Sequence, residues 1–182
     1  NKVLNSARTV CSTSQAMANE VSQHFDRSNL KVVLFGIDPD VFIPTKEKDQ
    51  PFTVGTIKSI ENNNNIDCFL DAVKIVISDY KLSNLQFLIV GEGSQLEKMK
   101  QKAKALNIYK NVTFSGFIPH ESIVEYYQQL SIFISVSTRE SFGVSVLEAA
   151  ACGVPAITSD VGGLPEVNQH NHTGWIIPPS QP

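Results

Sequence analysis

The chain has 182 residues, of which 42% are hydrophobic and 18% are charged, a composition typical of one ordinary globular domain with a small appendage. Its formal net charge of -3 gives no basic footprint, which excludes a nucleic-acid-binding role. No apolar run approaches the ~20 residues of a membrane span, and the three cysteines fit no zinc or CxxC spacing. A reducing cytoplasm is the simplest compartment for such a chain.

Two short strand patterns enclose a helix pattern near the start of the chain. Residues Thr9 to Ser12 and residues Lys31 to Phe35 predict strands. Between them, Met17, Val21 and Phe25 fall on one face of a helix. This part therefore predicts a strand, a helix and a second strand.

From residue 51 onward, strand and helix patterns alternate. The strands are expected at 52–57, 85–90, 112–114, 132–136 and 155–158. The helices are expected at 66–77, 95–106, 119–129 and 143–152. The alternation predicts an α/β fold, a Rossmann-like parallel sheet with helices on both faces and ligands outside the carboxyl ends of its strands. Trp175 falls in a later strand pattern and is expected in the core, as are Cys68 and Cys152 in their helices.

A glycine turn follows the strand expected at 85–90. Gly91 and Gly93 suggest a dinucleotide fingerprint, but its third glycine would fall at Leu96 and no acid follows at the required distance. We therefore interpret Gly91 and Glu92 as a tight turn at the rim of a nucleotide site. The asparagine run at 62–65 predicts a loop.

The stretch from Thr138 to Glu166 is the richest in functional residues. The strand expected at 132–136 runs into a polar turn and then into a helix. The first amides of that helix, near Phe142, Gly143 and Val144, have no partner within the helix and point into the turn. Gly143 also lets a ligand approach the backbone closely. The pattern predicts an anion site that suits phosphates.

Two carboxylates flank this anion site. Glu140 lies in the turn, and Glu148 lies inside the helix, roughly 7 to 8 Å along the axis from Gly143 at about 1.5 Å per residue. A carboxylate can accept from two vicinal hydroxyls, as a sugar or a ribose presents them. Taken singly, Glu140 is better explained as an exposed turn glutamate and Glu148 as a solvated helix glutamate. The combination with the Gly-Val-Pro stop at 153–155 and the Gly-Gly-Leu-Pro-Glu turn at 162–166 favours a binding site.

Residues 140–167, ESFGVSVLEAAACGVPAITSDVGGLPEV, closely resemble glycosyltransferase family 4, whose enzymes are retaining and whose fold is called GT-B. Glu140 and Glu148 match its E-x7-E element. The resemblance extends from about Thr9 to Pro179 and is densest after Gly116. It implies the C-terminal half of a GT-B fold and a retaining transferase of the hexosyl type, as used in polysaccharide biosynthesis.

The resemblance also implies roles for single residues. Glu148 would hold the ribose hydroxyls of a UDP- or GDP-linked sugar, and Glu140 would face the sugar that is transferred. The diphosphate would lie against the amides of Ser141, Phe142, Gly143 and Val144. The nucleobase would be bordered by Gly116, Phe117 and Ile118. As is usual in the family, no metal and no other cofactor is expected.

The family's positive charge near the diphosphate is missing from its usual places. The family commonly has an arginine where this chain has Thr56, and a lysine a few residues later, where the loop at 62–65 has no basic residue. Cations or amide dipoles are needed there, because negative charge grows as the sugar leaves. Lys58 is the nearest substitute as a phosphate ligand, and a surface lysine is the alternative. Arg139, next to Glu140, could help or could pair with a nearby acid.

Residues 36–44, GIDPDVFIP, resemble the family's signature at the crossing between its two domains, with Phe35 in place of the usual asparagine. We therefore expect residues 1–37 to be the tail of an N-terminal acceptor domain and 38–50 to be a linker. Residues 51–182 would be the nucleotide-sugar domain, truncated at its C-terminus. A carbohydrate or lipid-linked acceptor would bind through the missing domain, so we expect the isolated chain to be inactive. The resemblance implies a cytoplasmic protein, with peripheral association at the inner face of the membrane as one option.

Two alternatives stay open at this point. The first is a nucleotide-sugar epimerase of the same architecture, which would not need the E-x7-E spacing. The second is a non-catalytic domain that binds a nucleotide-sugar, which the missing basic residues make worth considering. The sequence does not name the base, the sugar or the acceptor.

Overall fold

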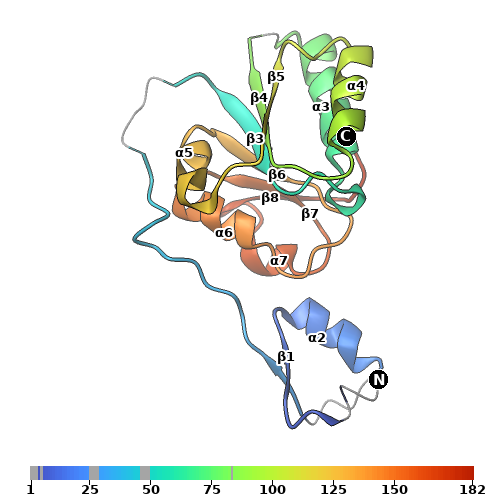
Figure 1. Ribbon diagram of the computed structural model, residues 1–182, viewed down its shortest axis with the longest axis vertical. Coiled ribbons are helices and arrows are strands. Elements are labelled where there is room, and N and C mark those ends of the chain that lie inside the picture. The colour runs from blue at the N-terminus through green and yellow to red at the C-terminus, as the bar shows by residue number, and fades with distance from the viewer. Residues whose placement is uncertain (1–3, 5, 25–28, 46–49, 83) are drawn as a thin grey trace.

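Six parallel strands form the central sheet of this computed structural model, which describes residues 4, 6–24, 29–45, 50–82 and 84–182. The strand order is β5-β4-β3-β6-β7-β8, and every neighbouring pair is parallel. Helices cover both faces of the sheet (Figure 1). The predicted fold class is confirmed.

The sheet elements follow the predicted alternation closely. The strands are β3 (Thr53–Ile57), β4 (Gln86–Val90), β5 (Val112–Gly116), β6 (Ile132–Ser135), β7 (Ala156–Ser159) and β8 (Gly174–Ile177). The helices are α3 (Ile66–Asp79), α4 (Leu96–Ala105), α5 (Ile123–Gln128), α6 (Val144–Ala151) and α7 (Leu164–Val167). Short 3-10 turns, η2 (Asn62–Asn64) and η3 (His120–Ser122), precede α3 and α5. None of the helices in the described parts of the chain is long and apolar enough to cross a membrane.

The sheet has a separate core on each face because successive residues of a strand point to opposite sides. In β4, Phe87 and Ile89 pack under α3 and α4, whereas Leu88 and Val90 pack under α5, α6 and α7. A strand that is buried on both faces has a continuous apolar sequence, as β4 does. Cys68 and Cys152 are buried, as predicted.

Trp175 was expected in the core, and this prediction is wrong. Its side chain is 50% exposed. Trp175 pairs with Ile157 across β7 and β8, and β8 is the last strand at this edge of the sheet. An apolar cavity of about 360 Å³ lies between α3 and the strands, and Ile157 and Ile177 line it.

The N-terminal elements form a small unit beside the main body (Figure 1). It consists of β1 (Val10–Ser12), α2 (Gln15–Ser22) and β2 (Leu30–Val32), and β1 and β2 are parallel. The hydroxyl of Ser14 caps α2 by accepting from the Met17 amide at 3.0 Å. Phe25, which was expected on the same helix, lies outside the described residues.

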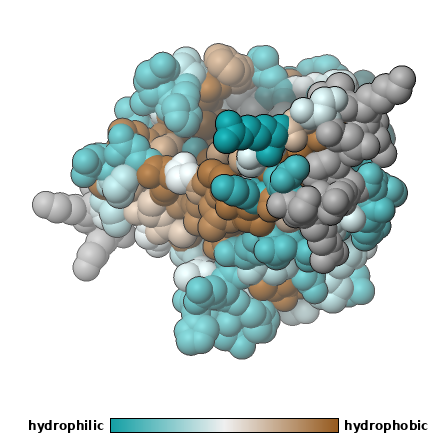
Figure 2. Space-filling view, turned by 90° about the horizontal axis from the view of Figure 1, so that it is seen from below, coloured by the Kyte–Doolittle hydropathy of each residue, from teal (hydrophilic) through white to brown (hydrophobic). Residues whose placement is uncertain are grey.

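The second N-terminal strand is shorter than predicted. The Val33 amide still donates to the carbonyl of Ser12, the last residue of β1. Beyond Val33, no strand among the described residues pairs with this segment. Val33, Leu34 and Phe35 are consequently about half exposed. Figure 2, seen from the end that carries this unit, shows apolar surface between polar patches.

Candidate functional site

Two adjoining cavities lie where β3 and β4 end and α6 begins. The strand-end cavity, about 300 Å³, contains Glu148 in its wall, and the helix-start cavity, about 240 Å³, contains Glu140. The two walls share Ile57, Lys58, Ser59 and Ser145. The cavities open at the carboxyl ends of the strands, where open parallel sheets place their ligands.

The start of α6 presents free backbone amides to the helix-start cavity. Among the described residues, no group accepts from the amides of Phe142, Gly143, Val144 and Ser145. Gly143 has a φ of 105°, which favours glycine, and an added Cβ would lie 2.9 Å from Leu164. Unpaired amides at the positive end of a helix form a site for an anion. Ser145 was not predicted, although its place in the first helical turn is a signal that could have found it.

The amide of Ser141, which was expected to face the diphosphate, has another partner. It donates to Oε1 of Glu140 at 3.1 Å. The four free amides therefore begin one residue later than the sequence suggested.

Lys58 lies in the wall that both cavities share. Its Nζ contacts Oε2 of Glu140 at 2.6 Å, the Ser137 hydroxyl at 2.8 Å and the Ser135 hydroxyl at 3.2 Å. The side chain is only 8% exposed, so the alternative of a surface lysine is wrong. The ammonium group is thus buried close to the free amides with a carboxylate as its counter-ion.

The asparagine run supports the lysine from behind. The expected loop is a 3-10 turn whose last residue, Asn64, is buried. The Asn64 amide donates to the carbonyl and hydroxyl of Ser59, and its oxygen accepts from Ser137 at 3.3 Å. Asn65 takes a left-handed conformation, φ 55°, directly before α3. The run therefore positions the Ser137 hydroxyl that contacts Lys58.

Glu148 lies on the other side of the shared wall. It is 9% exposed, so the alternative of a solvated helix glutamate is wrong. The Tyr127 hydroxyl donates to its Oε2 at 2.6 Å. Burial, and then the charge of Glu148, raise the pKa of Tyr127 well above its usual range, which keeps the hydroxyl protonated as a donor. Sequence reasoning missed Tyr127, which lies in α5, 21 residues before Glu148.

The glycine turns form the wall opposite Glu148. Gly91, Glu92, Phe117 and Ile118 all line the strand-end cavity. A Cβ on Gly91 would lie 1.9 Å from the Lys58 carbonyl, so this turn packs directly on the lysine backbone.

Two other predicted residues lie elsewhere. Gly116 does not line this cavity and instead ends β5, where its carbonyl accepts from the Gly91 amide at 2.9 Å. Arg139 is 82% exposed and lies 3.7 Å from Glu20 of α2, so it pairs with an acid, which was one of its two expected roles. It lines a third cavity of about 430 Å³, the α2 cavity, to which Glu140 also belongs.

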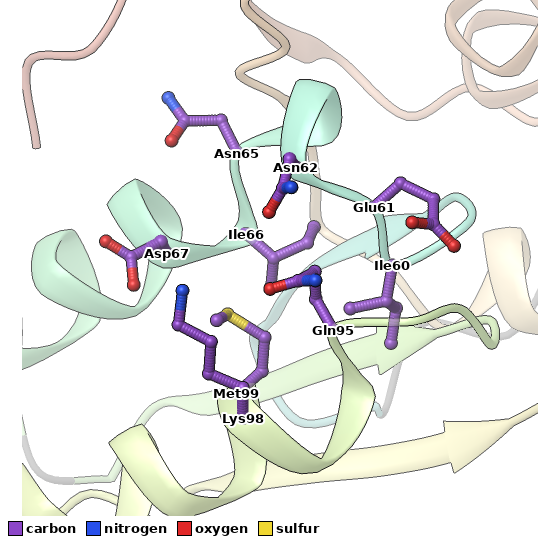
Figure 3. Close-up of a pocket in the computed structure, with 9 residues that line it drawn as sticks. All are labelled: Ile60, Glu61, Asn62, Asn65, Ile66, Asp67, Gln95, Lys98 and Met99. Carbon is purple, nitrogen blue, oxygen red and sulfur yellow. The ribbon is translucent and has the colours of Figure 1, made fainter.

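A much smaller cavity lies beside the site, between η2, the start of α3 and α4 (Figure 3). Its lining residues are Ile60, Glu61, Asn62, Asn65, Ile66, Asp67, Gln95, Lys98 and Met99. At about 40 Å³ it has room for water but not for a nucleotide. The strand-end and helix-start cavities, which hold both acids, Lys58 and the free amides, are therefore the candidate site.

Comparisons with known proteins find one matching family and several relatives. Residues 37–182 match the family described as "Glycosyl transferases group 1". The 2-deoxystreptamine N-acetyl-D-glucosaminyltransferase of Niallia circulans is 35% identical over 99 residues, 54% of this chain and 25% of that protein. The N-acetyl-alpha-D-glucosaminyl L-malate synthase of Bacillus anthracis is 40% identical over 91 residues, 50% of this chain and 23% of that protein.

A similar fold is found among solved structures. The crystal structure of Anabaena Alr3699/HepE in complex with UDP and glucose has a TM-score of 0.87 and 19% identity. The similarity covers 98% of this chain and 51% of that chain. The chain thus spans about a quarter of the two relatives and half of this structure.

Proposed function

Because the chain belongs to the glycosyl transferases group 1 family, we propose that it binds a nucleoside-diphosphate sugar and, within the full-length protein, transfers the sugar to an acceptor hydroxyl. The observation that carries this proposal is the arrangement at the start of α6. Four free amides and a buried lysine lie together, with Glu140 on one side and Glu148 on the other. The family match favours neither the epimerase nor the binding-only alternative.

The diphosphate would occupy the helix-start cavity. The amides of Phe142 to Ser145 would donate to its oxygens, and Lys58 would approach it from the shared wall. Fixed amide dipoles and a buried ammonium group stabilise the negative charge that develops on the diphosphate as the glycosidic bond breaks. With this positive charge in place, we propose that the reaction needs no metal and no other cofactor.

The nucleoside would occupy the strand-end cavity. Tyr127 takes Oε2 of Glu148, so Oε1 is left to accept from the ribose hydroxyls. The base would lie against Phe117 and Ile118, with Gly91 and Glu92 at the rim.

The sugar would point from the diphosphate towards Glu140. In keeping with the resemblance to family 4, we propose that the acceptor hydroxyl takes the sugar on the face that the diphosphate leaves, with retention of configuration. We further propose the division into an acceptor-domain tail (1–37), a linker (38–50) and a nucleotide-sugar domain (51–182). The acceptor, a carbohydrate or lipid-linked molecule, would be held mainly by the acceptor domain. A cytoplasmic site of action, with or without peripheral membrane contact, fits such a reaction.

Nucleotide titration of the full-length protein tests the binding site. We expect one of UDP, GDP and ADP to bind, and Lys58→Met to weaken it tenfold or more because a buried cation is lost. Lys110→Met, on an exposed lysine away from the cavities, is the matched control. If none of the three nucleotides binds, or if Lys58→Met binds as the wild type does, the proposal is wrong.

Glu140→Gln tests the role of the first acid. Removing the charge 2.6 Å from Lys58 frees the ammonium group for the diphosphate. We therefore expect nucleotide affinity to rise severalfold while transfer falls sharply. Proton NMR of the product of the wild-type enzyme checks the stereochemistry, and an inverted anomeric configuration would refute retention.

A further inference from the structure

Helix α2 receives its N-terminal charge from a distant part of the chain. It has no acidic residue in its first turn. The Gln15 amide donates to Oε2 of Glu166 at 2.9 Å, and the Ala16 amide donates to Oε1 at 2.8 Å. These partners are 151 and 150 residues apart in the sequence. With the Met17 amide on Ser14, the exposed amides of the first turn are all paired.

Glu166 is connected to the backbone of Glu140 through the glycine turn at 162–163. It lies in α7, and the glycine turn that leads into α7 packs on Glu140. The Gly163 amide donates to the Glu140 carbonyl at 3.1 Å. A Cβ on Gly162 would lie only 1.8 Å from the same carbonyl oxygen. The turn and Glu140 therefore cannot shift independently.

The contact joins two elements that line the α2 cavity, helix α2 and the glycine turn at Gly162. Met17 and Glu20 of α2 form one wall of this cavity, and Arg139 and Glu140 form the other. The pair between Arg139 and Glu20 is exposed and 3.7 Å long, so it holds the walls together only weakly. The carboxylate of Glu166, with two charge-assisted hydrogen bonds at a helix N-terminus, is the stronger connection.

We propose that Glu166 is a positioning residue that fastens α2 to the turn behind Glu140. It thereby fixes the wall formed by α2 at a constant distance from the acid that would face the transferred sugar. The link to catalysis rests on the proposed function, because it assumes that the acceptor approaches Glu140 through the α2 cavity. The attachment of α2 itself does not depend on that assumption.

Hydrogen exchange in the full-length protein tests the attachment. Glu166→Gln replaces one of the two acceptor oxygens by an NH2 group and removes the charge, so the amides of Gln15 and Ala16 should exchange at least tenfold faster. Glu166→Asp keeps the charge on a shorter side chain and should lie in between. Glu125→Gln, the same change at an exposed position of helix α5, is the control and should leave the exchange of both amides unchanged. Unchanged exchange in Glu166→Gln overturns the proposal.

Steady-state kinetics test the positioning role. In Glu166→Gln we expect a higher KM for the acceptor and a lower kcat, with nucleotide affinity unchanged and partial rescue by Glu166→Asp. Faster exchange with unaltered acceptor kinetics would reduce Glu166 to a structural contact and overturn the positioning role. Failure of the proposed function would look different, since the wild type would then bind no nucleotide while the exchange difference persisted.

Discussion

Replacing Tyr127 with phenylalanine removes one buried hydrogen bond and changes little else. The tyrosine is fully buried, and its ring packs against Phe42 and Phe133 at centroid distances of 6.0 and 5.8 Å. Tyr127→Phe keeps those contacts and opens no large cavity. The loss of stability in this variant therefore measures the contribution of the 2.6 Å hydrogen bond from the Tyr127 hydroxyl to Glu148.

The magnitude follows from the burial of both partners. A hydrogen bond to a charged group contributes about 1.5–3 kcal/mol to the free energy of unfolding. In the described part of the chain Glu148 has no second donor to replace the hydroxyl, so we expect a loss near the upper half of that range, ~2–3 kcal/mol. At roughly 2–4 °C per kcal/mol for a domain of this size, the Tm should fall by roughly 4–12 °C.

Urea unfolding at pH 7, followed by tryptophan fluorescence, measures this loss. The neighbouring Tyr126 is the matched control, because it is only partly buried and its hydroxyl has no hydrogen bond among the described residues. Tyr126→Phe should change the free energy of unfolding by less than ~0.5 kcal/mol. In a Glu148→Gln background, Tyr127→Phe should cost much less, because no charge is then left without a donor. If Tyr127→Phe is as stable as Tyr126→Phe, the bond contributes nothing and the reasoning fails.

Three further predictions concern the same half of the molecule. Burial, and then a neighbouring carboxylate, raise the pKa of the Cys152 thiol from 9.0 to about 11. The resulting stabilisation is complete below pH 9 and is lost as the pH rises to about 11. Cys152→Ala should therefore reduce the fall of the unfolding free energy between these two pH values. If the free energy falls as steeply in the variant as in the wild type, the prediction is wrong. Gly162→Ala should cost about 3 kcal/mol in urea unfolding because it combines a positive φ with a Cβ too close to the Glu140 carbonyl, whereas Gly36→Ala, with no atom within 4 Å, should cost less than ~1 kcal/mol. Asn168→Ala removes a side-chain amide that donates to three acceptors around β7 and β8. A thermal melt should show that the free energy of unfolding falls by ~2 kcal/mol or more, and an unchanged Tm would contradict this.

The fold could be predicted because each strand of a covered parallel sheet carries its own signal. The apolar run that became β4 is buried on both faces, and such a run has few other structures available to it. The error at Trp175 has the opposite cause. Its strand pattern is correct, but β8 is an edge strand, and the order of the strands is a property of the whole fold rather than of the residues near Trp175.

The candidate site was predictable only where its parts are neighbours in the sequence. The free amides and the spacing of Glu140 and Glu148 belong to one turn and one helix, so their geometry follows from helix dimensions. The partners of Lys58 come from β6 and the loop behind it, 77 to 82 residues further along the chain. One usable signal was present: Ser135 interrupts the otherwise apolar run at 132–136, and a buried hydroxyl needs a hydrogen-bond partner.

The position of Lys58 explains how the site could work without the family's usual basic residues. Lys58 is the one lysine or arginine in the walls of the strand-end and helix-start cavities, as far as the chain is described. Its charge is balanced by Glu140 at 2.6 Å, so the free site carries little net positive charge from side chains. In the proposed function, the diphosphate would share Lys58 with that carboxylate and take most of its stabilisation from the amides of α6. Because the same carboxylate would face the sugar, binding of the donor and the placement of Glu140 are coupled through one ammonium group.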